Sequence, residues 1–178
     1  MKLTLWFDGG CGPNNPGGIA TYGWLVKDEA GRLVGSGKGV AHNGGPLATN
    51  NVAEWSGLIK GLRFIAGLAQ LPTTLLIYGD SQLVINQFNR RWKCNKPHLQ
   101  NLCNRAHKLI AELGIKPTAC WIPREQNTEA DTLSETACYE AGGTPFRRPL
   151  RQHATMDFRT TDDDNRRAAL IWHGLLPF

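Results

Sequence analysis

The feature that most constrains the fold is an unbroken apolar run over residues 75–78 (LLIY), which Gly79 and Asp80 follow. A strand without a polar position is expected where both faces of a sheet are covered. Residues 52–65 and 83–88, on either side of the run, carry apolar side chains at helical spacing. The pattern therefore predicts an α/β fold in which helices cover the sheet that contains residues 75–78.

The remaining elements are predicted by their own periodicity and punctuation. Strands are expected over residues 3–8, 19–27, 33–41 and 118–122, and the first should end in a turn at Gly9-Gly10. Residues 28–32 suit a hairpin, so the sheet should start antiparallel. Helices are expected from an N-cap at Thr49, Asn50 or Asn51 to about residue 68, from Ser81, over 97–112, and from Asn127 to Gly142. This order predicts a five-stranded mixed sheet flanked by helices, with its first and fourth strands adjacent at the centre.

Composition excludes several other classes of protein. Of the 178 residues, 41% are hydrophobic and 20% are charged, as in an ordinary globular domain. No stretch approaches the roughly 18 apolar residues of a membrane span, and the N-terminal residues do not resemble a signal peptide. We therefore expect a cytoplasmic protein with no membrane association and no obligate protein partner.

The cysteines give little sign of a disulfide framework or a metal site. There are five of them, an odd number with no CxxC pair, which indicates reduced thiols. Cys94, His98, Cys103 and His107 have a spacing that suggests zinc, but their spacers match no common zinc motif and Pro97 interrupts the first half. Helix-face cysteines are the favoured interpretation.

The composition changes after residue 143, which predicts a domain over 1–143 and an extension over 144–178. The extension ends in an apolar set that is too large to leave in water, so we expect it to pack on the domain or on a second copy of the chain. A substrate-binding role for Arg147, Arg148 and Arg151 is the alternative, and the acidic run at 162–164 argues against it. The apolar set is Leu170, Ile171, Trp172, Leu175, Leu176 and Phe178.

The positive charge is concentrated in one stretch. Residues 82–124 hold eight Lys and Arg residues and one acid, Glu112, for a net charge of +7. Such a block favours a polyanionic partner, and a solvated helix face is the alternative.

Four acidic residues lie at the ends of predicted elements: Asp8, Glu54, Asp80 and Asp131. Each has a simpler explanation when it is taken alone: Asp80 as a helix cap, Glu54 as a favourable charge near a helix N-terminus, and Asp131 as part of a capping box with Thr128. Together, they can converge to hold two Mg²⁺ ions, which prefer carboxylate oxygens. Two such ions activate a water and stabilise the leaving oxygen in phosphodiester hydrolysis.

Five strings resemble the motifs of type 1 ribonuclease H, in order and at compatible spacing, over residues 1–141. The resemblance implies a five-stranded mixed sheet with flanking helices. It also implies endonucleolytic cleavage of the RNA strand of an RNA/DNA hybrid with Mg²⁺ or Mn²⁺. The strings are residues 7–11 (FDGGC), 15–18 (NPGG), 49–54 (TNNVAE), 79–84 (GDSQLV) and 127–131 (NTEAD).

Carried over by motif, the resemblance implies that Asp8, Glu54, Asp80 and Asp131 are the metal-binding catalytic acids, with Asp8 as the bridge between two ions. Thr49 would seat a phosphate of the DNA strand. The basic stretch, and not a family motif, supplies Arg90, Arg91 and Lys93, which with Lys96 are expected to hold the polyanion in place of the family's basic protrusion. Five further residues would line the minor groove, where the 2′-hydroxyl distinguishes RNA from DNA. These are Cys11, Asn15, Asn50, Ser81 and Gln82.

The chain departs from the family pattern in three places. The loop over residues 11–15 is one residue longer than usual, and the 50 residues between Asp80 and Asp131 leave no room for the family's basic protrusion. Many members have a mobile histidine before the last helix, where this chain has residues 123–127 (PREQN). Arg124 or Glu125 is the candidate substitute, although a guanidinium does not act as a base at neutral pH.

Three rival functions differ in what they require. A 3′–5′ exonuclease of the same superfamily typically has an acid two residues after the first, where this chain has Gly10. A catalytically silent hybrid-binding module would be indicated by the loss of an acid, and all four acids are present. An interaction domain would act through the extension. The sequence therefore favours a ribonuclease H.

Overall fold

The computed structural model describes residues 1–145, and the predicted packing of the extension lies outside the described residues. Within this range the chain forms one five-stranded sheet in the order β3-β2-β1-β4-β5. This confirms the predicted mixed sheet. The strands are β1 (Lys2–Gly12), β2 (Gly17–Asp28), β3 (Leu33–Gly45), β4 (Thr74–Gly79) and β5 (Thr118–Trp121).

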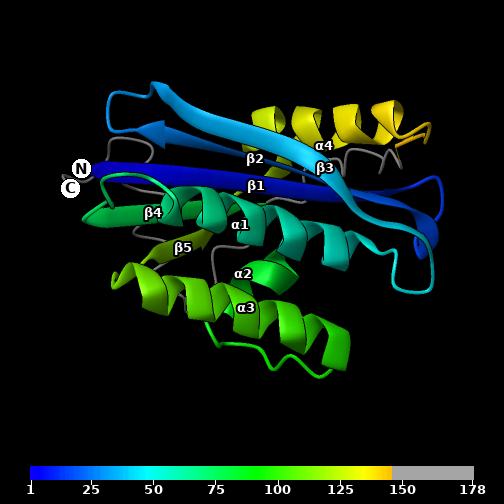
Figure 1. The fold of residues 1–178 in the computed structure, drawn as a ribbon. Helices are drawn as coiled ribbons and strands as arrows, with labels where there is room; N and C mark the ends of the chain where they lie inside the picture. Colours follow the sequence, from blue (N-terminus) through cyan, green and yellow to red (C-terminus); the bar gives the residue numbers. More distant parts are fainter. Residues whose placement is uncertain (146–178) are drawn as a thin grey trace, which may run out of the picture. The chain divides into compact units, whose positions relative to one another are not determined.

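β1 lies at the centre of the sheet, as predicted (Figure 1). It pairs with β2 in antiparallel fashion and with β4 in parallel fashion, and the ladder with β4 ends at the pair Phe7 and Gly79. The predicted turn at Gly9-Gly10 is wrong. Both glycines stay extended and pair with Tyr22 and Thr21 of β2, so β1 continues to Gly12.

Helices cover both faces of the sheet (Figure 1). α1 packs on one face and α3 lies against it, whereas α4 packs on the other face over β1 and β2. Among the described residues, no helix is both long and apolar enough to span a bilayer. The helices are α1 (Asn50–Ala66), α2 (Gln82–Phe88), α3 (Pro97–Leu113), the short 3₁₀ helix η1 (Arg124–Gln126) and α4 (Thr128–Glu140).

The main core lies between β1 and α1. Leu3, Leu5 and Phe7 alternate along β1 and are fully buried. A Cβ on Gly61 of α1 would lie 2.4 Å from Leu5 Cδ1, which shows how closely the helix packs on the strand. Burying each large apolar side chain stabilises the fold by about 1.5–3 kcal/mol. This packing fixes the position of α1 relative to β1.

Candidate active site

Two aspartates follow directly where the β1–β4 ladder ends. Asp8 comes after Phe7 and Asp80 after Gly79, which are the last paired residues of the two strands. Because these strands are parallel and adjacent, both carboxylates lie at the same edge of the sheet. Asp8 is 5% exposed, and Asp80 is partly buried.

Glu54 reaches the same place from α1. A Cβ on Gly9 would lie 2.2 Å from the backbone N of Glu54, so only glycine lets α1 approach β1 this closely. One carboxylate oxygen each of Asp8, Glu54 and Asp80 lies within 4.8 Å of the other two. We call these three residues the acidic cluster.

Gly79 is also needed for close packing at the site, because it leaves room for the Phe7 ring. A Cβ there would lie 2.4 Å from Cζ of the Phe7 ring, which fills the space under the end of β4. The glycines beside Asp8 and Asp80 are therefore required by close packing, and neither has a positive φ.

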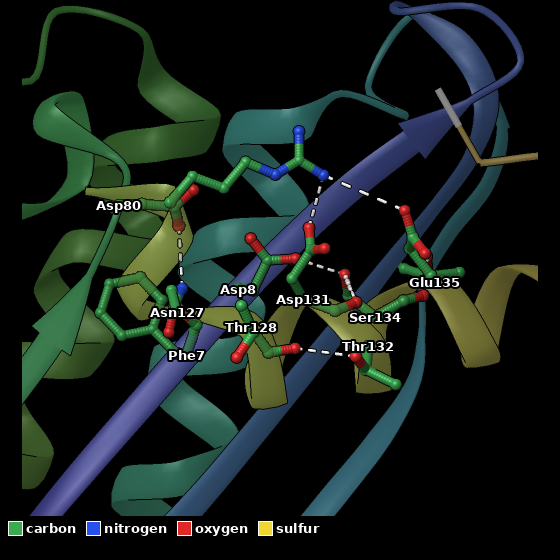
Figure 2. A network of polar contacts seen from close by, with 11 residues as sticks. Phe7, Asp8, Asp80, Asn127, Thr128, Asp131, Thr132, Ser134 and Glu135 are labelled. Atoms are coloured by element: carbon green, nitrogen blue, oxygen red, sulfur yellow. Dashed lines mark hydrogen bonds and ion pairs between the residues drawn. The ribbon is translucent and has the colours of Figure 1, made fainter. Parts of the chain in front are cut away.

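Asp131, the fourth predicted acid, lies beside the acidic cluster and is not one of its three members. Its Oδ1 accepts a hydrogen bond from Arg124 Nη2 at 2.5 Å, and the same nitrogen lies 4.0 Å from Glu135. Figure 2 shows Asp131 close to Asp8 and Ser134. The structure thus brings all four acids to one site, three as a cluster and one as the partner of an arginine.

Burial and mutual repulsion shape the electrostatics of the site. Burial, and then the charges of Asp80 and Asp131, raise the pKa of Asp8 to about 8, while the Ser134 hydrogen bond and Arg124 act in the opposite direction. Burial also raises the pKa of Asp80, against the hydrogen bond from Asn127. The metal-free site therefore holds more negative charge than its surroundings stabilise, and a cation would relieve this.

Arg124 remains a cation. Burial opposes its charge, but the hydrogen bond and charge of Asp131, together with the charges of Asp8 and Asp80, outweigh burial and raise the pKa of the Arg124 guanidinium. Its role here is to neutralise and hold Asp131 rather than to accept a proton.

The donor set fits a hard divalent cation. The acidic cluster offers only carboxylate oxygens, the ligands that Mg²⁺ and Mn²⁺ prefer. Within residues 1–145 it is the only group of three or more potential metal ligands. Cys94, His98, Cys103 and His107 do not come together as a metal-binding group in the described residues; His107 Nδ1 faces Cys103 Sγ at 3.7 Å, and its Nε2 lies 2.8 Å from the carbonyl oxygen of Phe88. No disulfide links the five cysteines in the described part of the chain.

Sequence reasoning missed two residues of the site, Asn127 and Ser134. The predicted capping box of Thr128 and Asp131 is wrong: the N-cap of α4 is Asn127, and within the described residues no side chain caps this helix. Asn127 Nδ2 donates instead to Phe7 O at 2.8 Å and to Asp80 Oδ1 at 2.9 Å (Figure 2). The hydroxyl of Ser134 donates to Asp8 Oδ2.

The sequence carried a signal for only one of these two residues. Ser134 is a hydroxyl residue on the buried stripe of α4, between Ala130 and Ala137. Asn127 has the sequence signature of an ordinary N-cap, which hid its contacts with β1 and Asp80.

The predicted groove residues lie around the N-termini of α1 and α2. Thr49 Oγ1 caps α1 by accepting from Val52 N, and Ser81 Oγ caps α2 by accepting from Val84 N. Asp80 is therefore not the cap of α2. Gln82 is exposed at the start of α2.

Asn15, Asn50 and Cys11 lie where β1 and β2 meet the start of α1. Asn15 is exposed, and its Oδ1 accepts from Asn50 N at 3.2 Å. Cys11 is 1% exposed, and its thiol lies 3.1 Å from the carbonyl oxygens of Asn14 and Ala48. Its side chain is therefore occupied inside the protein, which leaves its backbone for any substrate contact.

The predicted cationic residues lie just after α2. Arg90, Arg91 and Lys93 are exposed, and Trp92 between them is 50% exposed. The segment folds back on α2, because the backbone N–H groups of Arg91 and Trp92 both donate to Asn86 O. We call residues 90–93 the basic segment. Glu125, the other predicted auxiliary residue, is exposed in η1.

Known proteins match this chain in sequence. The bifunctional protein Rv2228c of Mycobacterium tuberculosis is 35% identical over 138 residues, which are 77% of this chain and 35% of that protein. Ribonuclease HI of Halobacterium salinarum is 32% identical over 140 residues, which are 79% of this chain and 66% of that protein. The chain thus spans about a third of the length of the mycobacterial relative.

Solved structures match the fold. The N-terminal RNase H domain of Rv2228c superposes with a TM-score of 0.71 at 34% identity, covering 80% of this chain and 96% of that one. LC11-RNase H1, solved in complex with an RNA/DNA hybrid, superposes with a TM-score of 0.70 at 25% identity, covering 79% and 99%.

The family described as "Reverse transcriptase-like" matches residues 7–137, which include all four acids and most of the sheet. Because this match covers most of the chain and the strand order agrees with that expected of a ribonuclease H fold, the chain belongs to the reverse transcriptase-like family of ribonuclease H-like domains.

Proposed function

We propose that this protein is a ribonuclease H, an endonuclease that hydrolyses the RNA strand of RNA/DNA hybrids with two divalent cations, Mg²⁺ or Mn²⁺. The observation that carries the proposal is the acidic cluster, in which three largely buried carboxylates meet within 4.8 Å where the β1–β4 ladder ends. Such a cluster is costly without a cation and well suited to one.

The four acids have distinct parts in the proposal. Asp8, Glu54 and Asp80 hold the cations, and Asp131 joins them from α4. When bound, the cations supply Lewis acidity at the attacking water and at the departing 3′ oxygen. Arg124 holds Asp131 in place and balances its charge, as the 2.5 Å contact indicates.

The substrate is proposed from the surface around the site. Asn15 and Asn50, at the start of the helix that carries Glu54, and Ser81 and Gln82, which follow Asp80, are the proposed contacts for the 2′-hydroxyls of the RNA strand. Thr49 lies at a helix N-terminus that suits a phosphate. The seven residues of α2, about 10 Å of helix, and its C-cap Asn89 separate Ser81 from the basic segment. The relative LC11-RNase H1 was solved in complex with an RNA/DNA hybrid, which supports this substrate class.

Cleavage of defined substrates tests the proposal. The protein is incubated with Mg²⁺ and one of four labelled substrates: RNA/DNA hybrid, double-stranded RNA, single-stranded RNA or double-stranded DNA. Each duplex is labelled on one strand and, in a separate reaction, on the other. We expect internal cuts in the RNA strand of the hybrid and none in its DNA strand. Tight binding of the hybrid with no cleavage in either Mg²⁺ or Mn²⁺ would instead indicate the silent binding module.

A further inference from the structure

Two side chains, one on α4 and one at its N-cap, contact the two aspartates of the acidic cluster, which follow the last pair of the β1–β4 ladder. The Ser134 hydroxyl donates to Asp8 Oδ2, and Asn127 Nδ2 donates to Asp80 Oδ1 at 2.9 Å (Figure 2). Each contact uses one of the two carboxylate oxygens. Both donors are more than nine-tenths buried, with Asn127 1% and Ser134 3% exposed.

Asn127 makes these contacts instead of capping its own helix. An Asn at an N-cap normally accepts a hydrogen bond from the helix backbone, but α4 has no side-chain cap in the described residues. The Asn127 amide instead bridges Phe7 O and Asp80 Oδ1, and its buried Oδ1 has no hydrogen-bond partner within residues 1–145. A local stabilising bond is thus given up in favour of a link between β1 and the residue that follows β4, where the β1–β4 ladder ends.

The packing of α4 on the sheet fixes the position of Ser134 relative to β1. Its carbonyl oxygen accepts from Thr21 Oγ1 of β2 at 2.9 Å. A Cβ on Gly23, also in β2, would lie 2.5 Å from Ala130 O, so α4 sits directly on the strand next to β1. The distance from the Ser134 hydroxyl to Asp8 is therefore set by the packing of the helix on the sheet.

We infer that Asn127 and Ser134 are positioning residues for the metal site, an inference that rests on the proposed function. Each holds one oxygen of an aspartate and leaves the other oxygen of Asp80 and Asp8 for the cations. Hydrogen bonds of this kind orient metal ligands, and removing one typically costs about 10- to 100-fold in metal affinity or activity.

The test compares Asn127→Ala and Ser134→Ala with the parent. Thr132→Ala and Thr136→Ala are the matched controls, because each removes an exposed hydroxyl that bonds a carbonyl oxygen of the same helix. Binding of Mn²⁺ alone is measured from the free Mn²⁺ signal in electron paramagnetic resonance. In parallel, kcat and KM for the hybrid are measured in Mg²⁺.

We expect Ser134→Ala and Asn127→Ala each to weaken Mn²⁺ binding by about 10-fold or more and to lower kcat, with KM for the hybrid nearly unchanged. The two controls should match the parent in all three quantities. Parental Mn²⁺ affinity in folded Ser134→Ala and Asn127→Ala would overturn the inference, whatever the cleavage rate.

The experiment still gives an answer if Asn127→Ala does not fold or if the parent does not cleave the hybrid. Ser134→Ala removes a single oxygen, so it decides the inference alone if Asn127→Ala does not fold. If the parent itself fails to cleave the hybrid, the proposed function fails, and the Mn²⁺ titration still decides whether the two residues position the acids.

Discussion

The acidic cluster and the basic segment carry opposite charges, and the fold holds them in different ways. Asp8 and Glu54 are 5% and 8% exposed; Asp8 is fixed within the central strand β1, and Glu54 lies on a helix pressed against Gly9. Arg90, Arg91 and Lys93 are exposed in a connection between two helices. Chemistry at a phosphate requires preorganised charge in a site with little water, whereas affinity for a polyanion requires only cations within reach of its backbone.

This contrast predicts that the two regions respond differently to substitution. A change in the acidic cluster should alter the rate of the chemical step and the stability of the domain. A change in the basic segment should alter affinity and its dependence on salt.

The largest effect is expected for Asp8→Asn. It should lower the rate of hybrid cleavage by at least about 10²- to 10³-fold, the reduction typical of removing one group that stabilises a charged transition state. The fold should survive, because asparagine keeps the shape of the side chain and removes one of several repelling charges. Cleavage within tenfold of the parent at the same Mg²⁺ concentration would refute the metal assignment.

The second effect concerns stability and pH. The pKa of Asp8 is about 8 in the folded protein, against an ordinary value of 3.8. Between these two pH values the folded state therefore keeps Asp8 protonated, whereas the unfolded state has lost this proton. Stability of the metal-free parent should therefore fall as the pH rises from about 4 to 8. Asp8→Asn should remove most of this slope, and Mg²⁺ should raise the melting temperature of the parent most at pH 8 and above.

Urea unfolding at a series of pH values in a chelating buffer measures this effect. If the free energy of unfolding depends on pH in the same way in the parent and in Asp8→Asn, burial and the neighbouring charges do not raise the pKa of Asp8 in the folded state.

The third effect tests the basic segment. Charge reversal at Arg90, Arg91 and Lys93 should weaken hybrid binding and reduce the slope of log affinity against log salt, by up to about 0.9 for each phosphate that the protein no longer neutralises. The single-turnover cleavage rate at saturating enzyme should change little. The same reversal at Lys108 and Lys116, outside the basic segment, is the control. An unchanged salt slope would mean that the basic segment is only a solvated surface.

The smallest effect is expected for the extension. If residues 144–178 pack on the domain or on a second copy, as their apolar residues predict, deleting them should lower the melting temperature by a few degrees and leave hybrid affinity nearly intact. An unchanged melting temperature with weaker hybrid binding would favour the alternative role of Arg147, Arg148 and Arg151.

Much of the fold could be predicted because its signals are local. The apolar run at 75–78, the hairpin at 28–32 and the caps Thr49 and Ser81 all act within a few residues of the chain, and all were confirmed. The four acids were identified as candidates because each follows a predicted strand or lies early in a predicted helix, where sites in mixed sheets form.

The errors arose where distant contacts override local preference. Gly9-Gly10 is typical of a turn, but Gly9 is needed for the approach of α1, and the strand continues. Asn127 is typical of a cap, but its amide bonds Phe7, which lies 120 positions earlier in the chain. Ser134 bonds Asp8 across 126 positions. Periodicity in a single sequence carries no information about such pairs.

A crystal structure with Mn²⁺ and uncleaved hybrid tests the central claim most directly, with anomalous scattering used to locate the metal. An RNA strand that cannot be hydrolysed at the scissile phosphate prevents cleavage, so the protein itself needs no substitution. We expect two Mn²⁺ peaks roughly 3.5–4 Å apart, both in contact with the acidic cluster and with one phosphate of the RNA strand. Mn²⁺ bound elsewhere, such as at Cys103 and His107, with no peak at Asp8, Glu54 and Asp80, would contradict the two-metal proposal.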